Sequence, residues 1–219
     1  MKVSYRTHNG LVRVNNEDAY LIHEPYLFAV ADGVGGCNAG EVASRQGLDA
    51  FAREVVKGIE SAEEPELLLR RAVSGANEKL YSMAMHQGEY RGMATTLTGV
   101  LLVEGQLYLV QIGDSRLYRW RQGLLTQLSV DQSVQNVLLQ ALGSETIVKP
   151  QITVFAVEMG DRYLLCTDGL TRMVPDAGLA EFLRETDTDK CAEGLLQGAL
   201  QAGGNDNVTI VVLDIVEEG

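Results

Sequence analysis

Tight turns in the middle of this chain constrain its fold more than any other feature. Segments 95–103 and 106–112 are predicted to form a β-hairpin around Glu104-Gly105, because alternating apolar runs flank the turn. A second hairpin joins 116–121 to 124–128. Such strand pairs are antiparallel, whereas a parallel sheet needs a long crossover between successive strands. The order of elements therefore predicts an α+β fold, a four-layer α-β-β-α sandwich in which two antiparallel sheets are flanked by helix pairs.

The remaining segments fit this order. Apolar spacing and turn residues predict two long helices before the hairpins, at 40–58 and 65–85. A short helix is expected at 133–142. The other expected strands are 3–8, 18–23, 26–31, 151–157, 162–167 and 207–216, and the other expected helices are 176–185 and 189–202. Strands 151–157 and 162–167 are expected to pair around Met159-Gly160-Asp161. No repeat, low-complexity tract or linker interrupts the pattern, so residues 1–219 are expected to form a single domain.

Composition excludes several functions. The net charge of −12 argues against binding to nucleic acid or to anionic membranes, because both require a basic surface. No apolar run approaches the roughly 20 residues of a membrane span, and no targeting signal precedes the first strand. Cys37, Cys166 and Cys191 are far apart and odd in number, which is typical of reduced thiols. We therefore expect a cytoplasmic protein that does not bind membranes.

Carboxylates recur at the ends of predicted strands. Asp32, Asp114 and Asp168 each follow an apolar run, and Asp206 precedes the last strand. Strand ends are rigid, so these side chains could hold a hard cation. Oxygen ligands without nearby His or Cys favour Mg²⁺, Mn²⁺ or Ca²⁺ over zinc, and no EF-hand loop is present. Each aspartate alone could be an ordinary turn residue, but the set together favours a metal site. Two cations bridged by one carboxylate would suit phosphate-ester hydrolysis.

Six motifs, in order along the whole chain, resemble those of the metal-dependent protein serine/threonine phosphatases, the PPM family. They are Gly10 to Asp18, Asp32-Gly33-Val34-Gly35-Gly36, Ala94-Thr95-Thr96, Ile112-Gly113-Asp114-Ser115-Arg116, Cys166-Thr167-Asp168-Gly169-Leu170 and Asp206-Asn207-Val208-Thr209. The resemblance implies a central antiparallel β-sandwich flanked by helices. It also implies a bacterial-type enzyme that hydrolyses phosphoserine and phosphothreonine esters through a metal-bridging water.

The same resemblance implies roles for individual residues. Two Mn²⁺ or Mg²⁺ ions would be bridged by Asp32. Asp168 and Asp206 would complete the first metal site, the Gly33 carbonyl would bind the second ion, and Asp114 with Asp168 would hold the third, weaker ion of bacterial members. Arg13 would grip the substrate phosphate, since its guanidinium matches phosphate oxygens.

Other residues of these motifs would support the site. Glu17 and Asp18 would order metal-bound water and Arg13. Asn207 would order the Asp206 loop, whereas Thr95 and Thr96 are expected to be packing residues of a strand.

Two departures from the family pattern carry predictions. Val34 stands where some members have a histidine proposed as general acid, so a metal-bound water is expected to protonate the leaving group. In addition, Asp131-Gln132-Ser133 runs almost directly into the segment that ends at Gly143, so the mobile flap of the family is expected to be largely deleted. This shortening predicts an open rim that accepts varied phosphopeptides or is completed by a partner, and it leaves open whether the third ion binds.

The alternatives belong to other functional classes. A pseudophosphatase would keep the fold only to bind a phosphoprotein, although it would not need three metal carboxylates. An acidic metal-binding regulator would do no chemistry. The leading interpretation is a monomeric phosphatase of signal transduction that acts on a phosphorylated protein opposite a Ser/Thr kinase.

Overall fold

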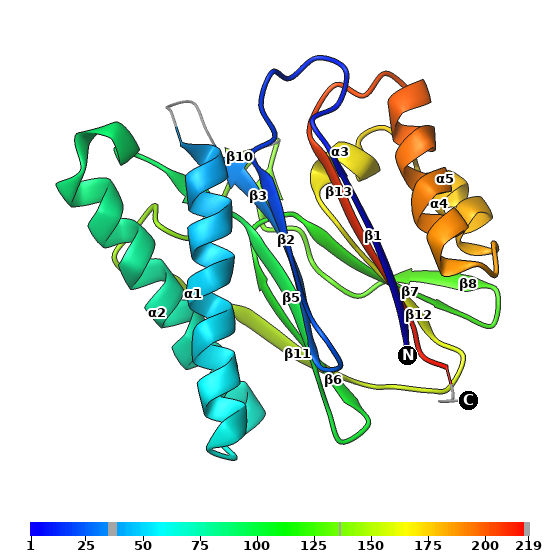
Figure 1. Ribbon diagram of the computed structural model, residues 1–219, viewed down its shortest axis with the longest axis horizontal. Helices are drawn as coiled ribbons and strands as arrows, with labels where there is room; N and C mark the ends of the chain where they lie inside the picture. The colour runs from blue at the N-terminus through cyan, green and yellow to red at the C-terminus, as the bar shows by residue number, and fades with distance from the viewer. Residues whose placement is uncertain (35–38, 136, 217–219) are drawn as a thin grey trace.

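Two antiparallel sheets pack face to face in the computed structural model, which describes residues 1–34, 39–135 and 137–216 (Figure 1). The five-stranded sheet has the order β1 (Lys2–His8), β13 (Val208–Asp214), β12 (Arg162–Cys166), β7 (Arg116–Arg121), β8 (Leu124–Gln127). The six-stranded sheet has the order β11 (Gln151–Ala156), β6 (Gln106–Ile112), β5 (Leu97–Val103), β3 (Leu27–Val34), β2 (Asp18–His23), and β4 (Ala94–Thr95) pairs with β3.

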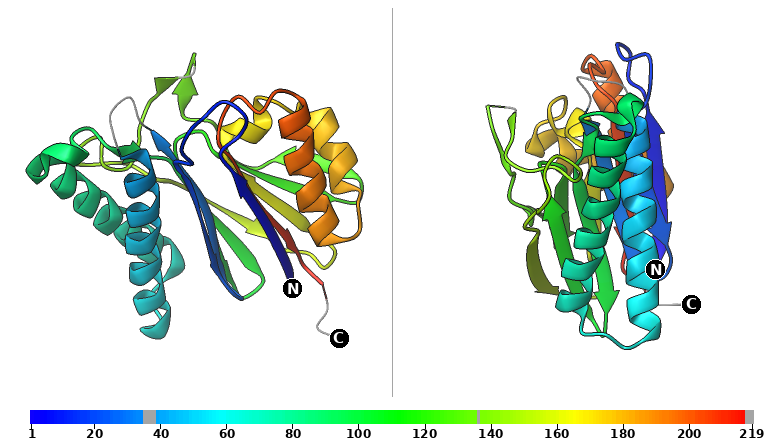
Figure 2. Two further views of the ribbon diagram at one scale, coloured as in Figure 1. Left: turned by 45° about the horizontal axis from the view of Figure 1, so that its top comes forward. Right: turned by 90° about the vertical axis from the view of Figure 1, so that its left-hand side faces the viewer.

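Helices cover the outer face of each sheet (Figures 1 and 2). The pair α1 (Gly40–Glu60) and α2 (Pro65–His86), followed by the 3₁₀ turn η1 (Gly88–Tyr90), covers the six-stranded sheet. The five-stranded sheet carries α3 (Asp168–Thr171), α4 (Asp176–Leu183) and α5 (Thr188–Gln201). The predicted four-layer α+β sandwich is confirmed.

Three apolar layers hold the four structural layers together. Phe51 and Leu69 belong to the layer between α1, α2 and the six-stranded sheet. Phe28 and Tyr163 meet in the centre of the sandwich, and both are fully buried. Leu195, on α5, belongs to the layer between the helices α4 and α5 and the five-stranded sheet. Because each sheet is covered on both faces, its central strands are apolar on both faces, which explains their nearly continuous apolar runs.

The predicted pairing of 151–157 with 162–167 is wrong. Strand β11 pairs with β6, whereas β12 lies between β7 and β13 in the other sheet. The connecting segment crosses from one sheet to the other. It is held by hydrogen bonds from the backbone N–H of Val157 to the Gly105 carbonyl and of Gly160 to the Ile215 carbonyl. A tight turn predicts a hairpin, but here burial of β12 in the centre of a sheet decided its partners.

The helix predicted at 133–142 is also wrong. Residues Ser133–Val134 (β9) and Val137–Leu138 (β10) form a small hairpin that stands out from the body of the molecule (Figure 2). Val134, Val137 and Leu139 are exposed. Their spacing fits a helix, but no surface of the described chain covers that face, so tertiary packing could not stabilise one.

Smaller differences concern ends and interruptions. The predicted strand 95–103 is divided into β4 and β5 at Thr96. The single turn α3 was not predicted, because it has only one turn of helical residues to signal it. Cys166 and Cys191 are free and buried, while Cys37 lies outside the described residues. Among the described residues, every helix is too short or too polar to serve as a membrane span.

Candidate active site

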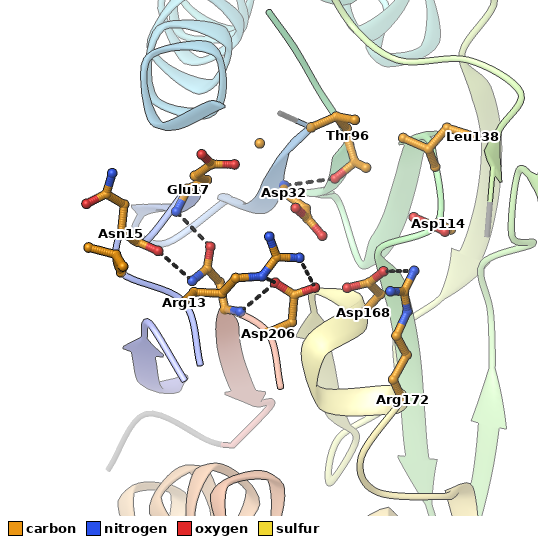
Figure 3. A pocket seen from close by; sticks show the side chains of 14 residues that line it. Arg13, Asn15, Glu17, Asp32, Thr96, Asp114, Leu138, Asp168, Arg172 and Asp206 are labelled. Carbon is orange, nitrogen blue, oxygen red and sulfur yellow. Dashed lines mark hydrogen bonds and ion pairs between the residues drawn. The ribbon is translucent and has the colours of Figure 1, made fainter. Parts of the chain in front are cut away.

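A cavity of about 450 Å³ opens where the ends of β3 and β12 meet the loop before β13 (Figure 3). Five carboxylates and two arginines line it, together with smaller and apolar side chains. The lining residues are Arg13, Val14, Asn15, Glu17, Asp32, Gly33, Val34, Thr96, Asp114, Leu138, Asp168, Arg172, Asp206 and Asn207. Asp32, Asp114, Asp168 and Asp206, which end or precede predicted strands, thus reach one cavity from four separate parts of the chain.

Asp32 is held at the end of β3 by two threonines. Its backbone N–H donates to Thr96 Oγ1 at 2.9 Å. Its carbonyl accepts from Thr95 Oγ1 and from the Thr96 backbone N–H, both at 2.9 Å. Thr96 Oγ1 also lies 2.8 Å from Ser115 Oγ. Both threonines are buried, Thr95 at the end of β4 and Thr96 between β4 and β5, and they also position the Asp32 backbone, a role that was not predicted.

Glycine is required next to Asp32 because backbones approach closely there. The N–H of Gly33 donates to the Glu17 carbonyl at 3.1 Å. A Cβ atom at position 33 would lie 2.3 Å from the Gly40 carbonyl oxygen and 2.6 Å from that of Glu17. Any side chain would therefore push apart α1, β3 and the loop before β2.

The carboxylates crowd one another. Burial raises the pKa of Asp32 well above its usual range, and the nearby carboxylates Asp18, Asp168, Asp206 and Asp114 raise it further. Burial also raises the pKa of Asp168. Like charges at this density in a partly buried cavity are unfavourable unless a cation offsets them. The oxygen-only donor set fits Mg²⁺ or Mn²⁺.

Asp18 lies behind this cluster, paired with Asp32 across β2 and β3. Its Oδ2 accepts a hydrogen bond from Thr167 Oγ1 at 2.8 Å. Its Oδ1 is buried and has no hydrogen-bond partner in the described chain. Burial raises the pKa of this carboxyl to about 7. The structure therefore places Asp18 against Thr167, beneath the cavity.

Asp206 is engaged by Arg13. Nη2 of Arg13 donates a hydrogen bond to Oδ2 of Asp206 at 3.0 Å, and Nε lies 3.0 Å from Oδ1 of the same carboxylate. Asn207 ties the same region together: its side chain donates to the carbonyls of Asn9 and Asn15 and accepts from the Glu17 N–H. The loop that carries Arg13 is thus attached to the loop that carries Asp206.

Arg172 is a cavity residue that the sequence analysis missed. Its Nη2 lies 2.5 Å from Oδ2 of Asp168, one helical turn earlier (Figure 3). The spacing of Asp168 and Arg172 could have indicated this contact, because residues four apart on a helix face one another. It was overlooked because α3 itself was not predicted.

Asp114 and the start of the hairpin are connected through Gln132. The Gly113 N–H donates to Gln132 Oε1, and the Gln132 N–H donates to the Gly113 carbonyl, both at 3.0 Å.

Val34 is 39% exposed at the cavity lip, and no histidine of the described chain lines the cavity.

The carboxylates do not yet converge on one point. In the described parts of the chain, no three His, Cys, Asp or Glu side chains stand close enough together to hold an ion. Two of the aspartates, Asp168 and Asp206, are instead turned toward Arg172 and Arg13. Coordination would thus require small side-chain rotations away from the arginines.

The chain is similar in sequence to known bacterial serine/threonine phosphatases. The chain is 35% identical to the serine/threonine protein phosphatase PstP of Mycobacterium tuberculosis over 99% of its own length, and it spans about half the length of that relative, 45%. It is 31% identical to the serine/threonine phosphatase Stp of Listeria monocytogenes, over 100% of this chain and 98% of that protein.

Solved structures show the same fold. The crystal structure of M. tuberculosis PstP superposes with a TM-score of 0.89 at 35% identity, covering 99% of both chains. A structure of the PstP catalytic domain in complex with two manganese ions superposes with a TM-score of 0.88 at 36% identity, covering 99% of this chain and 98% of that one. The Protein phosphatase 2C family profile matches residues 8–200. This chain therefore belongs to the protein phosphatase 2C family, the PPM phosphatases.

Proposed function

We propose that this chain is a metal-dependent phosphoprotein phosphatase that hydrolyses phosphoserine and phosphothreonine esters. One observation carries the proposal: Asp32, Asp114, Asp168 and Asp206 line the same cavity as Arg13, an arginine that can bind phosphate. An isolated acidic cavity would be poorly suited to a phosphate dianion. The same cavity filled with divalent cations would attract one.

The residues that would hold two Mn²⁺ or Mg²⁺ ions are those at the strand ends. We assign Asp32 as the bridging ligand, Asp168 and Asp206 to the first ion, and the Gly33 carbonyl to the second. Asp114 with Asp168 would hold a third, weaker ion. When bound, such ions activate water and neutralise charge on phosphoryl oxygens. Glu17 in the cavity lining and Asp18 beneath the cavity would order metal-bound water, and Glu17 and Asp18 would also order Arg13.

Arg13 would bind the substrate phosphate. Its side chain is 53% exposed at the cavity, and its guanidinium already forms a two-pronged contact with an oxyanion, the Asp206 carboxylate. A phosphate offers the same geometry of paired oxygens. We infer that Arg13 exchanges Asp206 for substrate when that carboxylate turns toward a cation.

The leaving group would receive its proton without a histidine. Val34 occupies the lip of the cavity, and the cavity lining within the described residues lacks an imidazole. We infer that water supplies the proton to the serine or threonine alkoxide. Aryl phosphates, whose leaving groups need less protonation, would then be hydrolysed faster than alkyl phosphates.

The cellular setting belongs to the same proposal. The acidic composition supports a phosphatase that does not bind nucleic acid or membranes, and the odd number of widely spaced cysteines supports a cytoplasmic one. We propose that residues 1–219 form one PPM-type domain of a bacterial-type signalling enzyme. It would act as a monomer on a phosphorylated protein, opposite a Ser/Thr kinase. The short β9–β10 hairpin in place of a longer flap leaves the cavity accessible to folded phosphoproteins.

Hydrolysis of p-nitrophenyl phosphate and of a phosphothreonine peptide tests the proposal. Turnover should require Mn²⁺ or Mg²⁺, cease with EDTA, and fall at least 100-fold in Asp32→Asn and Asp206→Asn. Asp49→Asn, on the exposed face of α1, is the matched control and should keep full activity. Arg13→Ala should raise KM while Mn²⁺ affinity in calorimetry stays within a few fold.

Two results would overturn the proposal. Metal-independent turnover would show that the carboxylates serve another purpose. Tight binding of Mn²⁺ and phosphopeptide without any turnover would identify a phosphoprotein-binding pseudophosphatase instead.

A further inference from the structure

Arg172 occupies a special position at the cavity. It follows Asp168 by four residues, so the single turn of α3 brings both side chains to the same face, where Nη2 lies 2.5 Å from the Asp168 carboxylate. The side chain is 42% exposed and lines the cavity. Its guanidinium is therefore reachable by anything that enters the cavity.

The placement of Arg172 repeats that of Arg13 at the opposite end of the carboxylates (Figure 3). Arg13 contacts Asp206, and Arg172 contacts Asp168. Their exposed fractions are similar, 53% and 42%. Among the described lining residues these two are the only cations. An extended substrate bound by Arg13 at its phosphate would thus have a second cation further along the same cavity.

Arg116 and Arg162 each hold several partners in place, whereas Arg172 has a single ionic partner among the described residues. Arg116 contacts both oxygens of Asp131 and also Tyr118. Arg162 is buried and contacts Asp214 and three backbone carbonyls. Arg172 has one ionic partner in the described chain, Asp168.

The contact with Asp168 leaves Arg172 donors to spare. A guanidinium carries five N–H donors, and a single exposed ion pair contributes little to stability. If Asp168 coordinates a cation, as proposed above, the carboxylate is drawn away and still more donors of Arg172 become available. The geometry therefore provides a second anion-binding position next to the reaction site.

We propose that Arg172 determines substrate specificity by binding a second anionic group of the phosphoprotein, close in sequence to the phosphorylated residue. The preferred substrates are then phosphoserine or phosphothreonine segments that carry a nearby carboxylate or a second phosphate. This inference rests on the proposed phosphatase function and names its substrate class.

Three phosphothreonine peptides of otherwise identical sequence test this inference. Their flanking positions carry asparagine, aspartate or a second phosphothreonine, so the two sources of anion are compared separately. The measurements are kcat/KM from phosphate release with Mn²⁺, and Kd from fluorescence anisotropy of labelled peptide. The wild type should prefer one or both anionic peptides over the asparagine peptide by roughly tenfold, about 1.4 kcal/mol, with the difference mainly in KM.

Variants at position 172 should change the ratio of kcat/KM for the anionic peptides to kcat/KM for the asparagine peptide. Arg172→Gln should lower the preference to about onefold to twofold, and Arg172→Glu should invert it. The preference of the wild type should also decrease with added salt. Arg184→Gln is the matched control, because Arg184 is an exposed arginine paired with Glu181 and does not line this cavity. It should keep the wild-type ratio.

An unchanged ratio in Arg172→Gln would overturn the inference. So would an equal loss on all three peptides together with weaker Mn²⁺ binding in calorimetry, since that pattern would make Arg172 a positioning residue for Asp168. Absence of turnover on every peptide, with a Kd preference that still depends on Arg172, would overturn the phosphatase proposal and uphold the anion-binding position.

Discussion

Asn207 and Glu17, 190 positions apart in the chain, are joined by a 2.9 Å hydrogen bond from the backbone N–H of Glu17 to Oδ1 of Asn207. The Nδ2 of Asn207 donates to the carbonyls of Asn9 at 3.1 Å and of Asn15 at 2.8 Å. One buried amide side chain therefore satisfies three backbone groups of the loop that carries Arg13. The relative position of Arg13 and Asp206 depends on it.

Replacing Asn207 should thus impair both stability and turnover. Asn207→Ala leaves these backbone groups without partners, so the free energy of unfolding should fall by about 2–3 kcal/mol. Because Arg13 is displaced, kcat/KM for a phosphopeptide should fall roughly 10- to 100-fold. Urea denaturation and steady-state kinetics measure the two effects. Asn205→Ala, at an exposed position of the same loop, should change neither. Equal behaviour of the two variants would show that Asn207 does not organise the site.

A methyl group at Gly169 should be among the most disruptive small changes in the chain. Its Cβ would lie 1.9 Å from the Asn207 carbonyl oxygen, which is backbone and cannot rotate away. Gly169→Ala should lower the free energy of unfolding by about 2–4 kcal/mol and separate Asp168 from Asp206. Gly88→Ala is the control, because no atom lies within 4 Å of its added Cβ. Thermal denaturation and Mn²⁺ calorimetry test this, and normal Mn²⁺ affinity in Gly169→Ala would contradict it.

Metal should reverse the effect of Asp32→Asn on stability. In EDTA the variant should be more stable than the wild type, because burial and the neighbouring carboxylates both raise the pKa of Asp32, and a neutral amide removes this buried, repelled charge. With Mn²⁺ at about 100 times Kd, the wild type should gain about 2.7 kcal/mol and the variant much less. Denaturant titrations with EDTA and with Mn²⁺ measure the change. A destabilised variant in EDTA would show that Asp32 is held by favourable contacts rather than by a missing cation.

Asp161 should make stability depend on pH. Burial alone raises the pKa of its carboxyl, but hydrogen bonds from Arg121, the Glu158 N–H and Tyr163 outweigh burial and leave the pKa below its ordinary value. A lowered pKa in the folded state means that this stabilisation is complete above the unfolded value of about 3.9 and is lost as pH falls through the folded value. In EDTA, the wild type should exceed Asp161→Asn by about 2–4 kcal/mol at pH 6, with the difference shrinking below pH 4. A difference that stays constant from pH 6 to pH 3.5 would contradict the assignment.

The buried pair of Arg162 and Asp214 should be strongly coupled. Nε and Nη2 of Arg162 lie 2.5 and 2.7 Å from the Asp214 oxygens, and Thr188 Oγ1 donates to the same carboxylate. Arg162→Met or Asp214→Leu alone should cost about 3–5 kcal/mol, because each leaves an unpaired buried charge. The double variant should cost less than the sum of the two. Urea denaturation of all four proteins gives the coupling, and strictly additive losses would contradict it.

Local pattern was a good guide where a segment is long or a turn is tight. Helices α1 and α2 and the hairpins β5–β6 and β7–β8 lie close to their predicted positions, since periodicity and turn residues act within one segment. The pairing of β11 and β12 was mispredicted because it depends on which sheet buries each strand. The 133–142 helix was mispredicted because apolar spacing has no effect without a surface to pack against.

The candidate site divides in the same way. The strand-end aspartates could be found from the sequence, because an apolar run followed by Asp-Gly is a local signal. Other features depend on contacts between distant segments. These are the threonines that hold the Asp32 backbone, the Asn207 amide that joins two loops, and the burial of an Asp18 oxygen without a hydrogen-bond partner among the described residues. Residue type alone does not record such contacts.

Short-range spacing and residue chemistry were sufficient to predict the α+β class, most of the strands and helices, and the identity of the carboxylates that line the cavity. How those carboxylates are held, and which cations face them, became visible only in the folded chain. Arg172 meets Asp168 through one unpredicted helical turn, and Arg13 meets Asp206 across 193 positions of chain. The contact of Arg172 with Asp168 is local, since residues four apart face one another on a helix. The contact of Arg13 with Asp206 instead follows from how the sheets pack, and burial sets that packing.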